Sequence, residues 1–301
     1  MVDNIELEAY KTKVIKYIVS VVPERIRSVI SNYLKAYNDI HELRLRLCAP
    51  LSFTVGTSNL ITGIKLSRDD IQYCIDKLTD SNYYKNEEIM RNGYICLPYG
   101  LRAGVCGDVF LSNGQIKVLK SVSSINIRLP SSLLIDCPNV INHIADSSFK
   151  SSILILSAPC SGKTTLLRSL AYSLSSPPYQ KRVCVVDTNR ELTLPFLTEN
   201  SICEYLSGYP KGYGISLATK YFNPEYIICD EIGSSEDALS ILESQHSGVP
   251  LIASVHCDTF SCIKKKKSIA SLIENGVFDT LIRIKRNIKS FDYEIKHTCD
   301  I

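Results

Sequence analysis

The spacing of apolar residues changes along the first part of the chain. Residues 11–37 repeat apolar side chains at helical intervals, and Pro23 divides them into two predicted helices. Residues 68–92 have the same spacing and predict a second pair of helices. Between the two pairs the period falls to two in HELRLRL, residues 41–47, where leucines alternate with arginines. That alternation predicts a half-buried strand with its leucines on one face and its arginines on the other.

A turn signal follows in the same part of the chain. Asn113 and Gly114 stand between DVFLS and QIKVL, and Asn-Gly between two strand-like segments is a strong signal for a β-hairpin. Helix pairs combined with hairpin-linked strands indicate an antiparallel sheet with helices packed on it. We therefore expect residues 1–132 to form a smaller, N-terminal α+β domain.

Apolar runs in the rest of the chain are continuous. Four of them, SILILS, RVCVVD, YIICDE and PLIASVH, each precede a stretch with helical spacing. Strands of this kind are buried on both faces, as in a parallel sheet covered by helices. We therefore expect residues 133–301 to form a second domain of the α/β class.

The composition is that of an ordinary globular protein, with 45% hydrophobic and 22% charged residues in 301. A net charge of +3 neither requires nor excludes a nucleic-acid partner. No apolar segment approaches the roughly 20 residues that span a bilayer, and charged residues interrupt the N-terminal segment, so we expect neither a transmembrane helix nor a secretory leader. The 12 cysteines occur singly, without a C-x-x-C pair, which predicts free thiols in a reducing cytoplasm.

The first continuous run leads into SAPCSGKTT, residues 157–165, and then into apolar residues at helical spacing. Strand, Gly-Lys-Thr and helix in this order are the signature of a P-loop, whose backbone N–H groups face a phosphate at a helix N-terminus. Lys163 is expected to pair with the β- and γ-phosphates of ATP, and Thr164 to ligate Mg²⁺. The second domain is therefore predicted to be a P-loop NTPase with a RecA/AAA-like parallel sheet and flanking helices.

We call residues 157–165 the phosphate loop. The residues expected to surround the nucleotide phosphates are Ser157, Ala158, Pro159, Cys160, Ser161, Gly162, Lys163, Thr164 and Thr165. Gly162 is retained beside the lysine, whereas Cys160 stands where a second glycine is common.

A further acidic pair closes another apolar run. YIICDE ends in Asp230 and Glu231. Asp230 is expected to bind Mg²⁺ through water, and Glu231 to act as the general base that polarises the attacking water. An Asp-Glu pair that merely follows a core strand at the surface is the alternative. The secondary candidates, which also follow apolar runs, are Asp187, Glu191, Ser254 and His256. For His256, local hydrogen bonding without a role in the site is the alternative.

Several stretches together resemble a known family. RNGYICLPYGLRAGVCGDVFLSNGQIKVLKSVSSINIRLP, the phosphate loop, GYPKGYG and YIICDEIGSSEDALSILESQHSGVPLIASVH look like stage III sporulation protein AA, over about residues 40–258. That family is similar to the ring-forming ATPases of type II and type IV secretion. The resemblance implies a cytoplasmic homo-hexamer that hydrolyses ATP and energises a channel between mother cell and forespore. It would lie at the inner face of a membrane through integral membrane partners.

The resemblance also implies roles for arginines of the N-terminal domain, which reach the γ-phosphate in related ring ATPases. The candidates are Arg44, Arg46, Arg102 and Arg128. A solvated sheet face is the alternative for each of them. The chain departs from the family pattern at a few positions: Ala158 replaces a proline, Cys160 a glycine, Thr188-Asn189 a Glu-Arg pair, and Lys220 an arginine.

Two alternative functions remain at this point. A nucleic-acid-dependent motor is suggested by the basic runs KKKK (264–267) and RIKRNIK (283–289), although a lysine run is more often a solvated helix end. A nucleotide-binding switch with little turnover is suggested by Cys160 and by the altered pair at 188–189. Structural metal sites and serine-hydrolase chemistry are not expected, because neither a C-x-x-C framework nor a G-x-S-x-G motif is present.

Overall fold

The computed structural model describes residues 4–37, 39–80, 93–112, 115–129, 134–158, 161–193, 201–244, 248–286 and 291–300. The chain divides into two compact units, Val2–Ser132 and Leu133–Ile301. In the described part of the chain, we find no helix whose length and apolar character would let it cross a membrane.

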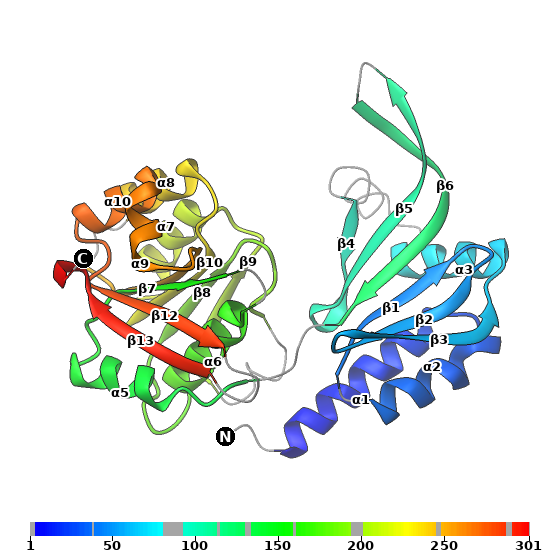
Figure 1. Cartoon of the computed structure of the whole chain (residues 1–301), viewed down its shortest axis with the longest axis horizontal. Helices are drawn as coiled ribbons and strands as arrows, with labels where there is room; N and C mark the ends of the chain where they lie inside the picture. The colour runs from blue at the N-terminus through cyan, green and yellow to red at the C-terminus, as the bar shows by residue number, and fades with distance from the viewer. Residues whose placement is uncertain are drawn as a thin grey trace. The chain divides into compact units, whose positions relative to one another are not determined.

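The N-terminal unit is an antiparallel sheet with helices. Its strands follow the order β3-β2-β1-β6-β5-β4, and every neighbouring pair is antiparallel. The strands are β1 (Ile40–Arg46), β2 (Pro50–Val55), β3 (Ser58–Lys65), β4 (Tyr94–Cys96), β5 (Arg102–Ser112) and β6 (Gln115–Arg128). The helices are α1 (Asn4–Ser20), α2 (Glu24–Ala36), α3 (Arg68–Thr79) and the short η1 (Pro98–Gly100). Figure 1 shows α1 and α2 beside β1, β2 and β3.

The elements predicted for this unit are largely present. Pro23 separates α1 from α2. In β1, Leu43 and Leu45 are fully buried, as the alternation predicts. Ser112 pairs with Gln115 across β5 and β6, so the hairpin is present, although its turn, residues 113–114, lies outside the described residues. The predicted second helix of the 68–92 pair also falls outside them, over 81–92.

Asp70 fixes the start of α3 and ties it to α2. Its carboxylate accepts a hydrogen bond from the Ser67 backbone N–H (2.6 Å), and the Ser67 hydroxyl accepts one from the Asp70 N–H (3.3 Å), which is a capping box. Arg25 of α2 donates to the same carboxylate through Nε (2.8 Å) and also through Nη2. The Arg25 hydrogen bond, opposed by burial and supported by Ser67, lowers the pKa of Asp70 to about 2.

Replacing Asp70 with asparagine is expected to lower the free energy of unfolding of the N-terminal unit by about 1–2 kcal/mol at pH 7, since Arg25 is half exposed and screened by solvent. The folded pKa lies below the ordinary 3.8, so the stabilisation is complete above that value and is lost as the pH falls toward 2. Urea unfolding of both proteins at pH 7 and pH 3 measures the difference, of which about half should remain at pH 3. A difference that does not change with pH would mean that the carboxylate charge is unimportant.

The second unit is an α/β sandwich with seven strands in the order β13-β12-β7-β11-β10-β8-β9. All neighbouring strands are parallel except β13, which runs antiparallel to β12. The strands are β7 (Ile153–Ser157), β8 (Val183–Asp187), β9 (Cys203–Ser207), β10 (Tyr226–Glu231), β11 (Leu251–His256), β12 (Thr280–Arg286) and β13 (Phe291–His297). This is the predicted fold class, and β7, β8, β10 and β11 are the four predicted strands.

Helices cover both faces of this sheet (Figure 1). Two of them pack on one face through a cluster around Leu166, Leu170 and Ile144: α5 (Pro138–Asp146) and α6 (Lys163–Ser175). Four pack on the other face: α7 (Lys211–Tyr221), α8 (Ser235–Ser244), α9 (Phe260–Lys265) and α10 (Lys267–Glu274). A final short turn, η4 (Thr298–Asp300), follows β13. The central strands are buried on both sides, which explains their continuous apolar sequences.

The residues after 260 are part of this sandwich. β12 pairs in parallel with β7, and β13 forms the sheet edge. Two basic side chains of the run 283–289 form ion pairs between these strands. Arg283 and Lys285 of β12 lie 3.6 and 2.8 Å from the Glu294 carboxylate of β13. From the first run, the Lys266 ammonium donates to the His256 carbonyl at 2.6 Å. Each basic run therefore has side chains that are paired within the second unit.

Candidate nucleotide site

Polar residues from several strands meet at one edge of the parallel sheet. Because β7, β8, β10 and β11 are parallel, their carboxyl ends lie at the same edge, where ligands bind in open α/β sheets. A cavity of about 120 Å³ lies there. Its lining residues are Lys163, Thr164, Leu167, Asn189, Glu191, Leu192, Asp230, Glu231 and Ser254. The structure thus brings six predicted site residues around one cavity, from four separate segments of the chain.

Gly162 shapes the phosphate loop. It has φ +99° and forms the N-cap of α6, a conformation that favours glycine. A Cβ at this position would lie 2.5 Å from the ring of Phe291, the first residue of β13. Ser161 Oγ lies 2.5 Å from Ser157 Oγ and within hydrogen-bond distance of the Ala158 carbonyl, and its one hydrogen can be donated to either oxygen. A larger residue at Gly162 would therefore be strained in its backbone and would require the Phe291 ring to move.

Three other residues predicted for the phosphate loop do not line the cavity or lie outside the described residues. Thr165 lies in the first turn of α6, one residue beyond Thr164, and is not among the residues that line the cavity. Pro159 and Cys160, including the departure from the common glycine, lie outside the described residues.

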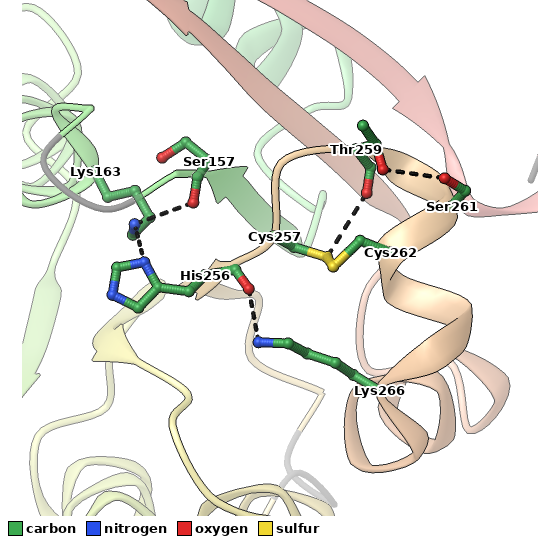
Figure 2. The surroundings of a disulfide bond; sticks show 8 residues. All are labelled: Ser157, Lys163, His256, Cys257, Thr259, Ser261, Cys262 and Lys266. Atoms are coloured by element: carbon green, nitrogen blue, oxygen red, sulfur yellow. Dashed lines mark hydrogen bonds between the residues drawn. A yellow bond between two sulfur atoms is a disulfide. The ribbon is translucent and has the colours of Figure 1, made fainter.

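Lys163, His256 and Glu231 form a continuous polar chain. The buried Lys163 ammonium donates to the carbonyls of Ser157 (3.2 Å) and Ala158 (3.0 Å), and it lies 2.6 Å from His256 Nδ1. Figure 2 shows the imidazole reaching this ammonium from the end of β11. The other imidazole nitrogen, Nε2, lies 2.7 Å from the Glu231 carboxylate. His256 therefore links the P-loop lysine to the predicted general base.

Asp230 lies deeper in the site and has a buried cationic partner. It is 4% exposed, and its Oδ2 accepts a hydrogen bond from the Asn189 backbone N–H at 2.9 Å. Oδ1 lies 2.8 Å from the ammonium of Lys211, which is also 4% exposed. Burial raises the pKa of Asp230, and the Lys211 charge opposes that rise. Sequence reasoning did not assign a role to Lys211, although it is the lysine of GYPKGYG, one of the stretches that carry the family resemblance.

The Asp187 carboxylate organises a loop and does not line the cavity. It is fully buried and accepts backbone N–H bonds from Glu191 (2.7 Å), Leu192 (2.9 Å) and Thr193 (3.0 Å). These bonds curl the segment after β8 so that Asn189 reaches Asp230 and Glu191 lines the cavity. Sequence reasoning gave Asn189 only as a departure from a family pattern and missed that its backbone contacts the acidic pair.

The residues present suit Mg²⁺ held together with a nucleotide. Apart from the Lys211 ion pair, Asp230 Oδ1 is buried without a hydrogen-bond donor among the described residues, so it can accept a metal-bound water. Thr164 lines the same cavity and offers a hydroxyl. No group of three or more His, Cys, Asp or Glu in the described ranges could hold a metal without help. Mg²⁺ commonly takes one or two protein ligands and completes its shell with phosphates and water, which fits this donor set.

The four arginine candidates lie on one face of the N-terminal sheet. Arg102 and Arg128 are directly opposite in β5 and β6, and Arg128 is opposite Glu42 of β1. Arg44 and Arg46 follow Glu42 at intervals of two and so share its face. Arg44 forms a close ion pair with Glu42, and Arg128 Nε lies 3.9 Å from the same carboxylate. Their proposed contact with the nucleotide stays a prediction.

One cysteine pair departs from the expectation of free thiols. Cys257 and Cys262 are joined by a disulfide, with their Cα atoms 5.8 Å apart, and the bond connects the end of β11 to α9 (Figure 2). Nine other cysteines are free, and Cys160 lies outside the described residues. The prediction was wrong for this pair because spacing in the sequence does not show which side chains the fold brings together.

Comparisons with known proteins find a family model, a curated relative and solved structures that are similar to this chain. A family model described as sporulation stage III, protein AA matches residues 11–292. The chain is 29% identical over 279 residues to stage III sporulation protein AA of Bacillus subtilis (strain 168), covering 89% of this chain and 90% of that protein.

The Legionella pneumophila ATPase DotB is similar in structure, with a TM-score of 0.61 and 16% identity over 90% of this chain and 80% of DotB. The pilus retraction motor PilT, solved with bound ADP, gives a TM-score of 0.65 and 12% identity over 89% of this chain and 82% of PilT. At these identities, the likeness to DotB and PilT shows a shared fold.

Proposed function

The chain belongs to the stage III sporulation protein AA family, and from this premise we propose that it is a Mg²⁺-dependent P-loop ATPase that works as a ring motor of the secretion-ATPase type. The observation that carries the proposal is that Lys163, Asp230 and Glu231 line one cavity at the N-terminus of α6. A lysine, a helix N-terminus and two carboxylates at one sheet edge are the parts that phosphoryl transfer from ATP requires.

ATP binding would begin with the phosphates. The first backbone N–H groups of α6 and its dipole favour an anion at the phosphate loop. The Lys163 ammonium, which lies on the Ser157 and Ala158 carbonyls, would exchange these neutral acceptors for the β- and γ-phosphate oxygens. That exchange is favourable because a charged acceptor makes a stronger hydrogen bond than a neutral one.

Hydrolysis would use Glu231. A water attacks the γ-phosphorus, its proton passes to the Glu231 carboxylate, and the bond from the γ-phosphorus to the bridging oxygen breaks to give ADP and phosphate. His256, 2.7 Å from this carboxylate but not among the residues that line the cavity, would orient it toward the water. Ser254 lines the cavity together with Glu231. Mg²⁺, when bound at Thr164 and Asp230, would neutralise charge on the phosphates.

Assembly and cellular role follow from the family and are also proposals. We infer a homo-hexamer in the mother-cell cytoplasm, attached to the membrane through integral membrane proteins of a channel to the forespore, which it would energise. The arginine face of the N-terminal sheet has side chains of the type that binds phosphate, because a guanidinium group can donate a pair of hydrogen bonds to it.

The two alternative functions have less support. Three residues of the basic runs that suggested nucleic-acid binding already have partners in the fold, because Lys266 donates to the His256 carbonyl and Arg283 and Lys285 pair with Glu294. The pair that suggested a switch also has structural roles, because Thr188 donates to the Tyr209 carbonyl at 2.9 Å and the Asn189 N–H binds Asp230.

Phosphate release from Mg²⁺-ATP should be measurable with the purified chain, and its rate per protomer is expected to rise with protein concentration as shared sites assemble. Phosphate release with and without Mg²⁺, over a hundred-fold range of concentration alongside sedimentation velocity, tests this. Activity that needs Mg²⁺ but does not vary with concentration would overturn the ring and retain the ATPase. Tight ATP binding without hydrolysis would favour the switch, and stimulation by DNA or RNA would favour the nucleic-acid motor.

A further inference from the structure

Lys211 is a buried lysine that the mechanism above does not use. It is the first residue of α7, and its side chain runs to the carboxyl end of β10. The ammonium lies 2.8 Å from Asp230 Oδ1 and 3.7 Å from Oδ2 of Asp237, in the first turn of α8. One buried charge therefore contacts two acids, one on each side of Glu231 in the sequence.

Stability alone does not account for a lysine in this place. Taking an ammonium out of water costs several kcal/mol, and ion pairs in the interior often do no better than apolar residues of similar size. The position at the start of α7 adds to the cost, because the helix dipole disfavours a cation at its N-terminus. A methionine would avoid both penalties but would leave the buried Asp230 carboxylate without its cationic partner, so the role of Lys211 lies in the acids that it contacts.

The contacts of the two acids show what the ammonium holds. The Asn189 N–H fixes Oδ2 of Asp230, whereas Oδ1 has the Lys211 ion pair and no other donor among the described residues. Asp237 Oδ2 accepts hydrogen bonds from the backbone N–H groups of Gly233 (3.1 Å) and Ser234 (3.2 Å). Lys211 thus joins the end of β10 to the turn that follows Glu231.

We propose that Lys211 is a positioning residue of the nucleotide site, which holds Asp230 and the turn after Glu231 in the arrangement that hydrolysis needs. This inference rests on the proposed function for its catalytic consequence, but the contacts themselves do not depend on it. Because Lys211 does not line the cavity, it acts on the reaction through Asp230 and through the placement of Glu231.

The experiment that tests this proposal compares Lys211→Met with Lys264→Met, in which the replaced lysine is an exposed residue of α9. Lys211→Met is expected to lower kcat for ATP by about 100-fold, the usual cost of a misplacement of about 1 Å, and to change KM by less than about 3-fold because the phosphate loop is untouched. Lys264→Met should match the wild type in both constants. A Lys211→Met variant with kcat within about 3-fold of the wild type would overturn the proposal.

Hydrogen exchange read by mass spectrometry tests the positioning without any need for turnover. In Lys211→Met, exchange is expected to rise at least about 10-fold in residues 231–237 and to stay unchanged in β7 and α6. An increase across the whole second unit would mean that Lys211 is structural only. If the wild type does not hydrolyse ATP, the proposed function fails, whereas this exchange pattern still decides whether Lys211 holds the segment.

A milder variant covers the case in which Lys211→Met does not fold. Asp237→Asn removes one of the two acids that face the ammonium but keeps an oxygen that can accept the Gly233 and Ser234 N–H bonds. It leaves Lys211 paired with Asp230, so no buried charge is left without a partner of opposite charge. We expect kcat to fall about 10-fold with KM unchanged, and an unchanged kcat would overturn the proposal.

Discussion

Replacing Lys163 with alanine is expected to weaken ATP binding by about 100-fold and to abolish measurable hydrolysis. The ammonium is buried at the N-terminus of α6 and is the one lysine or arginine among the described residues that line the cavity. Its loss removes charge-assisted hydrogen bonds worth about 3 kcal/mol in total, which corresponds to about 100-fold in affinity. Titration with a fluorescent ATP analogue measures binding, and phosphate release measures turnover.

Lys163→Met separates the lost charge from lost packing, since methionine keeps most of the side-chain volume. It should behave like Lys163→Ala in both assays, while Lys264→Met on α9 should match the wild type. Binding within about 5-fold of the wild type in both Lys163 variants would show that this lysine does not contact the phosphates, and the P-loop assignment would fail.

Glu231→Gln is expected to keep ATP binding close to the wild-type level and to lower kcat by about 1000-fold. The amide has nearly the same shape as the carboxylate but cannot take a proton from the attacking water, and general-base catalysis contributes factors of about 100 to 10,000. The contrast with Lys163→Ala is useful, because one variant loses binding and the other loses the chemical step. Single-turnover hydrolysis with saturating Mg²⁺-ATP measures the step directly.

Two further acids serve as controls for that prediction. Glu236→Gln changes an exposed acid of α8 that does not line the cavity, and its rate should equal the wild-type rate. Glu191→Gln changes the other glutamate on the cavity wall and should cost less than about 10-fold. A larger loss from Glu191→Gln than from Glu231→Gln would transfer the role of base to Glu191.

The fold class and the family could be predicted from the sequence because their signals are local. β7, β8, β10 and β11 are buried on both faces, so each appears as a short apolar run. The phosphate loop follows the first of these runs, and the acidic pair ends a later one. Since parallel strands place their carboxyl ends together, the meeting of Lys163, Asp230 and Glu231 follows from topology alone.

Other features depend on contacts that spacing does not show. β12 carries the first part of the stretch interpreted as a basic patch, and the sequence does not show that Arg283 and Lys285 pair with Glu294 on the neighbouring strand β13. β9 lies at the edge of the sheet, and only Leu206 of its five residues is buried. Its sequence therefore has no continuous apolar run from which a strand could be predicted. In the sequence, Lys211 cannot be distinguished from a surface lysine, and only the structure shows that it is buried against Asp230.

The order of strands in the second unit also bears on how the protein is made. β7, which leads into the phosphate loop, lies between β11 and β12, and both of these come much later in the chain. Phe291 of β13, later still, packs against Gly162. During synthesis the phosphate loop therefore leaves the ribosome long before the strands that support it, and the sheet around it is complete only when almost all of the chain has been translated.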